Sequence, residues 1–365
     1  LTSDQTVYNV NEETEERIST FRFMRGKDST EGKEIILGDI VAIPKLESTI
    51  AGDTLGTKGE ILKFRPIKFP KPVYSVAVFP KSRADEDKLG NAITKMLKED
   101  CTLSYEKNPE TNDAVLSGMG DMHLDIVLSK IKERYKVDLD TRTPKVPYRE
   151  TIKKKASAQG KHKKQSGGRG QYGDVWFELA PLEKNAGIEF IDRVVGGAVP
   201  KNYIPAAAKG LREAAARGYL AGYPATDFSC AIFDGSYHDV DSSEMAFKIA
   251  ASIAFKKCME QANPILMEPV MNVEVTVPED CLGDVMGDFN SRRGRIMGID
   301  SEGKLQIVKA QCPLSEMFRY AIILRSMTSG RGSFSMEYSH YEEVPGDIAK
   351  KVIDQAAQER KDEEE

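Results

Sequence analysis

Val73–Leu139 reads VYSVAVFPKSRADEDKLGNAITKMLKEDCTLSYEKNPETNDAVLSGMGDMHLDIVLSKIKERYKVDL. Strand patterns and helical patterns alternate along it, and the second helical pattern is amphipathic. The predicted elements follow the order strand, helix, strand, strand, helix, strand: Val73–Phe79, about 84–98, Leu103–Glu106, Ala114–Ser117, about 121–134 and Val137–Leu139. This order is that of the split βαβ, or ferredoxin-like, arrangement.

The same order of elements returns near the end of the chain, within 268–345. Its predicted strands and helices are Met271–Val277, about 279–290, Ile296–Ile299, Leu305–Ala310, about 314–326 and Ser333–Ser339. The repetition is one of topology and not of residues. Two such units indicate an α+β multidomain protein.

Residues 1–68 show short β-rich runs between Gly and Asp turns, as in Ile35–Leu37 and Ile40–Ile43, with no helical period. This pattern is typical of a β-barrel. The barrel is predicted to be partial, and the first residue is Leu1 rather than Met, so we expect a truncated start. Two prolines make Lys68–Pro72 a linker, because proline cannot donate to a strand ladder.

The part between the two ferredoxin-like units, 148–267, has a different pattern. Strands are predicted at Val175–Leu179, Glu189–Arg193 and Phe228–Phe233, and helices from Pro205 to about Arg217 and from Ser242 to about Gln261. In the second helix, Met245, Ile249 and Ile253 recur every four residues and are predicted to form its buried face. Asp241, three residues before Glu244, is predicted to cap that helix. The tail after Pro345 is helix-prone and is expected to be solvated.

Composition excludes several classes of protein. The 365 residues are 40% hydrophobic and 30% charged, without an apolar run long enough to cross a bilayer. The five cysteines are dispersed, without C-x-x-C pairs, which argues against disulfides or a zinc site and for reduced thiols in or near cores. The net charge of −5 does not favour nucleic-acid binding by itself, so the distribution of charge matters more.

One segment concentrates positive charge. Lys153–Gly173 contains seven Lys or Arg residues and no acid, and its end is rich in glycine. Such a loop is typical of contact with a phosphate backbone, since glycines allow close approach and Arg and Gln side chains donate hydrogen bonds. The alternative is a loop that is merely solvated. The candidate contacts are Lys161, Lys163, Lys164, Gln165, Ser166, Gly167, Gly168, Arg169, Gly170 and Gln171.

A second candidate is the turn before the last predicted helix of the middle part. It holds Ser236, Tyr237, His238 and Asp239. His238 has no nucleophile signature or second histidine near it in sequence, so catalysis is disfavoured against an exposed tip that contacts a base. A plain capping turn is the remaining interpretation.

A third basic group, Arg292, Arg293 and Arg295, lies in the last unit, with Arg325 and Arg331 further along. It is either a solvated turn or a second RNA contact. Neither ferredoxin-like unit carries the aromatic pair of an RNA-recognition motif. The closest approach to a phosphate-binding loop, Gly52–Gly59, has the wrong spacing and ends in Gly where Mg²⁺ ligation needs a hydroxyl. No nucleotide hydrolysis is therefore assigned to these residues, and no catalytic or metal-binding residue is predicted.

Several of these segments together resemble elongation factor G: Gln165–Gly173, Gly235–Glu244, Gly196–Pro200, Leu220–Pro224 and Pro313–Phe318. Gly118–Asp125 resembles a third-domain segment of the same family. The similarity runs in order from Ala51–Leu55 to Ser333–Glu337. It implies a later half of a barrel domain, a ferredoxin-like third domain, a fourth domain of the ribosomal-protein-S5-like α+β type, a ferredoxin-like fifth domain and a tail, at 1–68, 69–147, 148–267, 268–345 and 346–365.

In this family the fourth domain reaches the decoding centre, where two tip loops accompany the tRNA–mRNA duplex during translocation. The resemblance maps these loops onto Gln165–Gln171 and Gly235–Asp241, and His238 onto the tip histidine. The fifth domain contacts large-subunit ribosomal RNA, which fits Arg292–Arg295. The expected partner is thus the ribosome, and the expected protein is a cytoplasmic monomer with no membrane partner.

The GTP-binding domain of the family is missing from the sequence. GTP and Mg²⁺ are therefore expected in a parent protein, and no cofactor is expected in these residues. Two alternatives are a family member specialised for ribosome recycling and a stand-alone ribosomal-RNA-binding protein without GTPase activity. An antibiotic-protection protein is disfavoured by the Ser166–Gln171 residues, and an enzyme with its own active site is disfavoured by the lack of a nucleophile–base or metal constellation.

Overall fold

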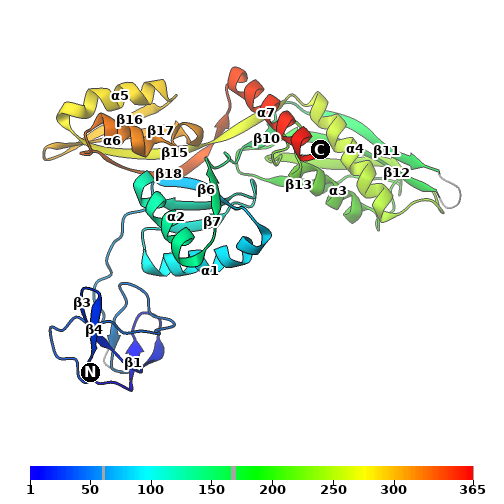
Figure 1. Cartoon of the computed structure of the whole chain (residues 1–365). Helices are drawn as coiled ribbons and strands as arrows, with labels where there is room; N and C mark the ends of the chain where they lie inside the picture. The colour runs from blue at the N-terminus through cyan, green and yellow to red at the C-terminus, as the bar shows by residue number, and fades with distance from the viewer. Residues whose placement is uncertain (60–61, 166–169, 365) are drawn as a thin grey trace. The chain divides into compact units, whose positions relative to one another are not determined.

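The computed structural model describes residues 1–59, 62–165 and 170–364, with side chains as far as Arg360. The chain divides into two compact units (Figure 1). The first comprises Leu1–Glu106 and Leu116–Arg142. The second comprises Lys107–Val115 together with the chain from Thr143 onward.

The N-terminal part of the first unit is a small β structure. A three-stranded sheet has the order β2-β1-β5 and a separate hairpin pairs β3 with β4, with the bounds β1 Gln5–Asn9, β2 Thr14–Ile18, β3 Arg22–Arg25, β4 Asp28–Glu31 and β5 Leu55–Gly56. Val7, Ile18 and Phe21 form its buried core. These sheets do not close into a barrel within the described residues, which agrees with a partial barrel.

The two strands predicted after this hairpin were wrong. Ile35–Leu37 has no strand or bridge assignment, and Ile40–Ile43 makes one isolated bridge, between Ala42 and Arg22. A turn separates them, in which the Asp39 carboxylate accepts the backbone N–H of Ile36 at 2.8 Å. Ile35, Val41 and Ile43 pack partly against the core, while Ile36, Leu37 and Ile40 are exposed. The expected linker Lys68–Pro72 has no regular structure, as predicted.

The elements from β6 to β9 follow the predicted ferredoxin-like order, although the tip of the β7–β8 hairpin, Lys107–Val115, belongs to the second unit. Its sheet runs β7-β8-β6-β9, and its elements are β6 Tyr74–Pro80, α1 Arg83–Glu99, β7 Ser104–Lys107, β8 Ala114–Gly118, α2 Asp121–Tyr135 and β9 Leu139–Arg142. Ser82 caps α1 by accepting the N–H of Asp85. The last strand begins at Leu139 rather than Val137, because Lys136 ends α2 in a left-handed conformation and Val137 enters the core.

The C-terminal ferredoxin-like sheet has the equivalent order, β16-β17-β15-β18. Its elements are β15 Pro264–Pro278, α5 Leu282–Ser291 after a 3₁₀ turn, β16 Arg295–Glu302, β17 Leu305–Pro313, α6 Tyr320–Met327 and β18 Ser333–Glu343. The helix predicted over 314–326 is instead a 3₁₀ turn at Leu314–Glu316 followed by α6. The carbonyl of Glu316 accepts a hydrogen bond from the Arg292 side chain at 2.7 Å instead of one from a helical N–H group four residues on.

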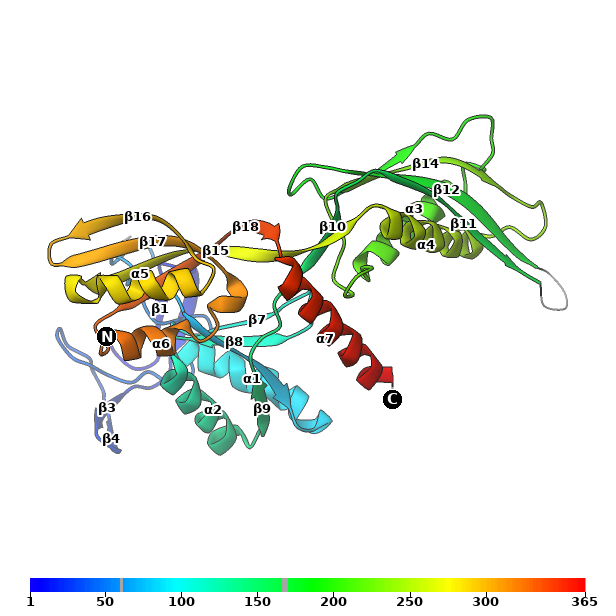
Figure 2. The same cartoon turned by 90° about the horizontal axis from the view of Figure 1, so that it is seen from above.

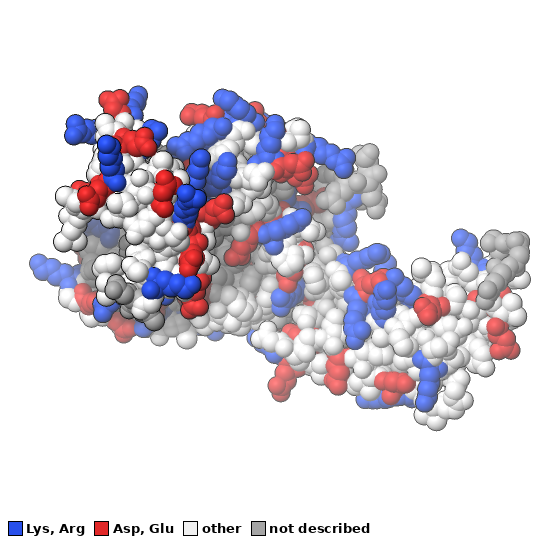
Figure 3. Space-filling model, turned by 90° about the horizontal axis from the view of Figure 1, so that it is seen from below, with Lys and Arg blue, Asp and Glu red and all other residues white. Residues whose placement is uncertain are grey.

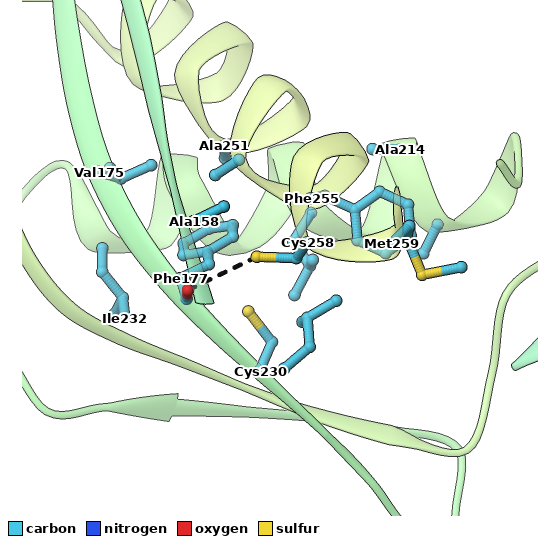
Figure 4. Packing of buried hydrophobic residues seen from close by; sticks show 14 of the residues in the cluster. Ala158, Val175, Phe177, Ala214, Cys230, Ile232, Ala251, Phe255, Cys258 and Met259 are labelled. Carbon is cyan, nitrogen blue, oxygen red and sulfur yellow. Dashed lines mark hydrogen bonds between the residues drawn. The ribbon is translucent and has the colours of Figure 1, made fainter. Parts of the chain in front are cut away.

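Residues 156–261, called the arm below, form a four-stranded sheet with two helices on one face (Figure 1). The strand order is β11-β12-β14-β13, and the elements are β11 Ala156–Lys164, β12 Gln171–Pro181, β13 Ile188–Asp192, α3 Ile204–Ala216, β14 Phe228–Ser236 and α4 Glu244–Gln261. Figure 4 shows Phe177 of β12 and Phe255 of α4 within the same core cluster. The arm therefore has one helix-covered sheet face and one face without helices.

The buried face of α4 differs from the predicted one. Met245 is 59% exposed, and Ile249 and Ile253 are only partly buried. The helix instead buries mostly small residues: Ala246, Phe247, Ala250, Ala251, Ala254, Phe255, Cys258 and Met259. Small residues let the helix backbone approach the sheet so closely that a Cβ on Gly160 would lie 2.0 Å from the carbonyl oxygen of Ala250.

The arm joins the C-terminal sheet through β10 (Arg149–Ile152), which pairs with the start of β15 (Figure 2). Glu150 of β10 is fully buried, and its carboxylate accepts the backbone N–H groups of Tyr219, Leu220, Ala221 and Tyr223 at 2.6–3.3 Å. The tail is α7, Gly346–Glu364. It was expected to be solvated, but Val352, Ile353 and Ala356 pack on the loop that Glu150 holds.

The cysteines are free thiols, as predicted, and four of the five are buried. Cys258 donates its S–H to the carbonyl of Phe177 at 3.5 Å, and burial raises the pKa of its thiol to about 12 (Figure 4). Such a thiol stays protonated and unreactive. Among the helices of the described residues, none combines the length and hydropathy of a membrane span.

Candidate nucleic-acid interface

The first predicted tip loop lies at the end of the β11–β12 hairpin. Lys163 pairs with Tyr172 and Lys164 with Gln171, so the strands stay in register up to the loop. Both lysines are exposed, and so is Gln165. Ser166, Gly167, Gly168 and Arg169 lie outside the described residues. The chain is described again from Gly170.

The second tip loop, 237–243, leads from β14 into α4. The backbone N–H of His238 donates to Ser242 Oγ at 2.9 Å, and the N–H of Ser242 donates back to the carbonyl of His238 at 3.1 Å. The residue that caps α4 is Ser243, whose hydroxyl accepts the N–H of Ala246 at 3.2 Å. The prediction that Asp241 caps the helix was therefore wrong. Its side chain is used elsewhere.

Asp241 joins the two loops. Its Oδ1 accepts the backbone N–H of Gly170 at 3.0 Å, and its carbonyl accepts the N–H of Tyr172 at 2.9 Å. A Cβ on residue 170 would lie 2.9 Å from Asp241 Oδ2, so a larger residue would have to displace this carboxylate. Although they lie far apart in the sequence, Gly170 of the first predicted tip loop and Asp241 of the second are adjacent, and the Asp241 carboxylate joins them.

A hydrogen-bond chain centred on the buried Asp174 lies on the strands that carry these loops. Ser236 Oγ donates to Asp174 Oδ2 at 2.7 Å and lies 2.7 Å from the hydroxyl of Tyr172. Gln159 donates to Asp174 Oδ1 at 2.9 Å. Asp174 is only 4% exposed, so these partners replace water around its carboxylate. The residues come from three strands, and no sequence motif indicated their contact.

His238 presents one ring nitrogen outward. Its Nδ1 accepts the backbone N–H groups of Val240 and Asp241 at 3.3 and 3.2 Å. Asp241 Oδ2 lies 3.6 Å from the same nitrogen. In the tautomer that accepts both N–H groups, the ring proton is on Nε2. Within the described part of the chain, Nε2 has no hydrogen-bond partner, and the side chain is 55% exposed. The ring is thus oriented as a hydrogen-bond donor toward solvent. Tyr237 beside it is 47% exposed.

Not all of the basic residues near the arm are available. Lys153 pairs with Glu343 at 2.7 Å and Lys155 with Glu178 at 2.9 Å. Lys161 lies 5.5 Å from the ring centroid of Tyr172 and remains exposed. Basic and acidic side chains alternate over the end of the arm beside the grey segment (Figure 3). Lys153 and Lys155 are thus already paired with acids, whereas Lys163 and Lys164 at the hairpin end are exposed.

The arginines predicted as a second contact are mostly used inside the protein. Arg292 pairs with Asp288 at 2.6 Å, and Arg293 binds the buried carboxylate of Glu268 with both terminal nitrogens. Arg295 differs, because its side chain is 68% exposed and lies 3.7 Å from Glu342. The three arginines therefore do not form one exposed cluster. An RNA contact stays a prediction for all three, although Arg292 and Arg293 already form ion pairs within the domain.

Family models match three successive parts of the chain. Elongation factor G domain III matches residues 69–143, domain IV matches 144–263 and the elongation factor G C-terminus matches 265–352. These matches, with two ferredoxin-like domains flanking the arm, define a translation factor. The chain belongs to the elongation factor G family.

A solved structure supports the same conclusion. The chain is similar to a protein of known crystal structure from Thermus thermophilus, with 41% sequence identity and a TM-score of 0.83. The similarity covers 98% of this chain and 54% of the other. The chain thus spans about half the length of this relative.

Proposed function

We propose that this chain acts on the ribosome during translocation, with the end of the arm at the tRNA–mRNA duplex. The observation that carries the proposal is the pairing of the two tip loops through Asp241 and Gly170. It sets exposed lysines and an outward-facing histidine at one end of an otherwise acidic protein. A cytoplasmic site of action is part of the proposal.

The mechanism would be steric and electrostatic. Lys163 and Lys164 would contact phosphates, while the hydrogen bond from Gly170 to Asp241 would hold the end of the loop beside them. Nε2 of His238 would donate a hydrogen bond to an acceptor on a base or sugar. The hydrogen-bond chain through Asp174 would keep both loops in place, so that the arm resists backward movement of the RNA.

We include GTP and Mg²⁺ in the proposal only for a longer parent protein, because this chain spans about half of its relative. Gly52–Gly59, the nearest approach to a phosphate-binding loop, contains the short strand β5 and is not followed by a helix in the described residues up to Val73. A phosphate-binding loop connects a strand to a helix N-terminus. The described residues therefore do not form a binding site for GTP and Mg²⁺.

Co-sedimentation with ribosomes over a salt series tests the contact. Lys163→Ala/Lys164→Ala is compared with Lys350→Ala/Lys351→Ala, which removes the same charge from exposed positions of α7. We expect binding to weaken with salt, and the hairpin variant to reduce the slope of log K against log salt by about 1–2. Equal behaviour of the two variants would overturn the proposed loop contact.

His238 is tested separately, in a full-length protein that carries these domains. His238→Ala removes the outward donor, while His238→Gln keeps an N–H group at the tip. We expect His238→Ala to slow translocation much more than it weakens ribosome binding, with partial rescue by His238→Gln. Equal losses of rate and binding would contradict the role given to this side chain.

A further inference from the structure

The face of the arm sheet that the helices leave uncovered carries an aromatic pair. Residues alternate along β12, so Val175 and Phe177 enter the core while Trp176 points to the other face. The ring of Trp176 lies 6.1 Å from that of Phe233 on the neighbouring strand β14, tilted by 49°. Trp176 is partly exposed and Phe233 is 37% exposed. Two aromatic rings thus share an open sheet face.

A β-bulge produces this arrangement. Trp176 is opposite Asp234 and Phe177 is opposite Ile232, so Phe233 has no partner of its own in the ladder. Bulges redirect a side chain without ending the pairing of the strands. Here the bulge turns Phe233 beside Trp176. The core opposite is filled by other aromatic side chains, so the pair is not needed there.

Several basic residues lie near the pair along the strands, together with one exposed acid, Asp234, which is opposite Trp176. Glu178, two residues along β12, is already neutralised by Lys155 at 2.9 Å and Arg193 at 3.1 Å. Lys161 and Lys163 follow β11 on the same face, opposite Asp174 and Tyr172. Among the described residues neither lysine has an acidic partner within ion-pair distance. Cations thus lie on both sides of the aromatic pair along the strands.

We propose that Trp176 and Phe233 form a stacking platform for unpaired bases of single-stranded RNA, with Lys161, which has no acidic partner among the described residues, contacting the backbone. Aromatic side chains on an open sheet stack bases of any sequence, while flanking cations neutralise the phosphates. The site lies on a different surface from the tip loops. It goes beyond the proposed function and rests on it only for the class of partner.

Trp176 is the single tryptophan of the chain, so its fluorescence reports on this site alone. The whole chain is titrated with a single-stranded uridine hexanucleotide and with an RNA duplex. We expect saturable, salt-sensitive quenching by the single strand and little by the duplex. Phe233→Ala should weaken binding about tenfold, and Phe233→Tyr, which keeps a ring, should restore it.

Tyr338→Ala is the matched control, since it removes a 52% exposed aromatic ring from a different sheet. It should leave the titration unchanged. Lys164→Ala separates the two proposals, because Lys164 lies on the other face of β11. Ribosome binding can weaken in this variant while Trp176 is still quenched. Absence of quenching, equal quenching by the duplex, or equal affinity of Phe233→Ala would overturn the platform. Any of these results would leave the face as a docking surface for protein at most.

Discussion

The side chain of Asp241 accepts the backbone N–H of Gly170 at 3.0 Å, although the two residues belong to different loops. The same residue uses its main-chain carbonyl for the N–H of Tyr172. One bond thus depends on the side chain and the other does not. This difference provides a control within a single variant.

Asp241→Ala should loosen the hairpin loop without unfolding the arm. A hydrogen bond to a charged group contributes about 1.5–3 kcal/mol, so we expect the amide of Gly170 to exchange about tenfold faster or more. The amide of Tyr172 should keep its protection, because its acceptor is the unchanged backbone. Hydrogen exchange measured residue by residue checks both. Equal loss of protection at the two amides would show that the whole loop depends on the side chain.

Gly160→Ala should destabilise the arm because the new methyl group meets the backbone of α4. Overpacking of a core costs about 1–3 kcal/mol, and here the neighbouring atoms cannot rotate away. Gly287→Ala in α5 is the opposite case. Nothing lies within 4 Å of its Cβ, and replacing glycine in a helix should add up to about 1 kcal/mol of stability. Urea unfolding distinguishes the two signs, and a stabilising effect at Gly160 would contradict the close packing.

Arg293→Ala should destabilise the C-terminal domain strongly. Its removal leaves the carboxylate of Glu268, whose side chain is 3% exposed, without its cation, and breaking a buried pair costs about 3–5 kcal/mol. Arg295→Ala should cost less than about 1 kcal/mol, since that side chain is mostly exposed. Thermal unfolding measures both. A small effect at Arg293 would reopen the possibility that this residue is available to a partner.

The N-terminal sheet should lose stability in acid because of Glu16. Burial alone would raise the pKa of this carboxyl, but hydrogen bonds from Ser48 and Thr49 outweigh burial and lower the pKa to about 2. A lowered pKa means that the carboxylate stabilises the fold above its ordinary pKa of 4.5. That contribution is lost as the pH falls from about 4.5 to 2.

Amide exchange of Val7 and Ile18, measured across this pH range and corrected for intrinsic rates, checks the prediction. Glu16→Gln should be less stable at neutral pH and should lack the dependence between pH 4.5 and 2. A variant that keeps the full dependence would place its origin in another carboxyl group.

The order of elements could be predicted from the sequence, because each ferredoxin-like strand and helix has its own local pattern. Local patterns fail where packing decides. Met245, Ile249 and Ile253 have the right spacing for a buried stripe, yet α4 buries alanines because Gly160 brings a strand close to it. Ile35–Leu37 looks like a strand but has no neighbouring strand to pair with.

The site divides in the same way. The two tip loops were predicted because each is a contiguous, polar and glycine-rich segment. Their connection through Asp241 was not predicted, because the sequence around Asp241 equally suggested a helix cap. Trp176 and Phe233 are far apart in the sequence and meet only through the bulged pairing of β12 and β14. The sequence argument considered aromatic residues only in the ferredoxin-like units, whereas this pair lies in the arm.

The strand β15 gives the second unit a mechanical property. Its first residues pair with β10 and the others pair with β17 and β18, so one uninterrupted strand runs from the base of the arm into the C-terminal sheet. A push along the arm would load these ladders in shear, with many hydrogen bonds sharing the force at once. Peeling would load them one at a time. Under a force along β15, the connection between the arm and the C-terminal sheet would therefore resist separation better than under peeling.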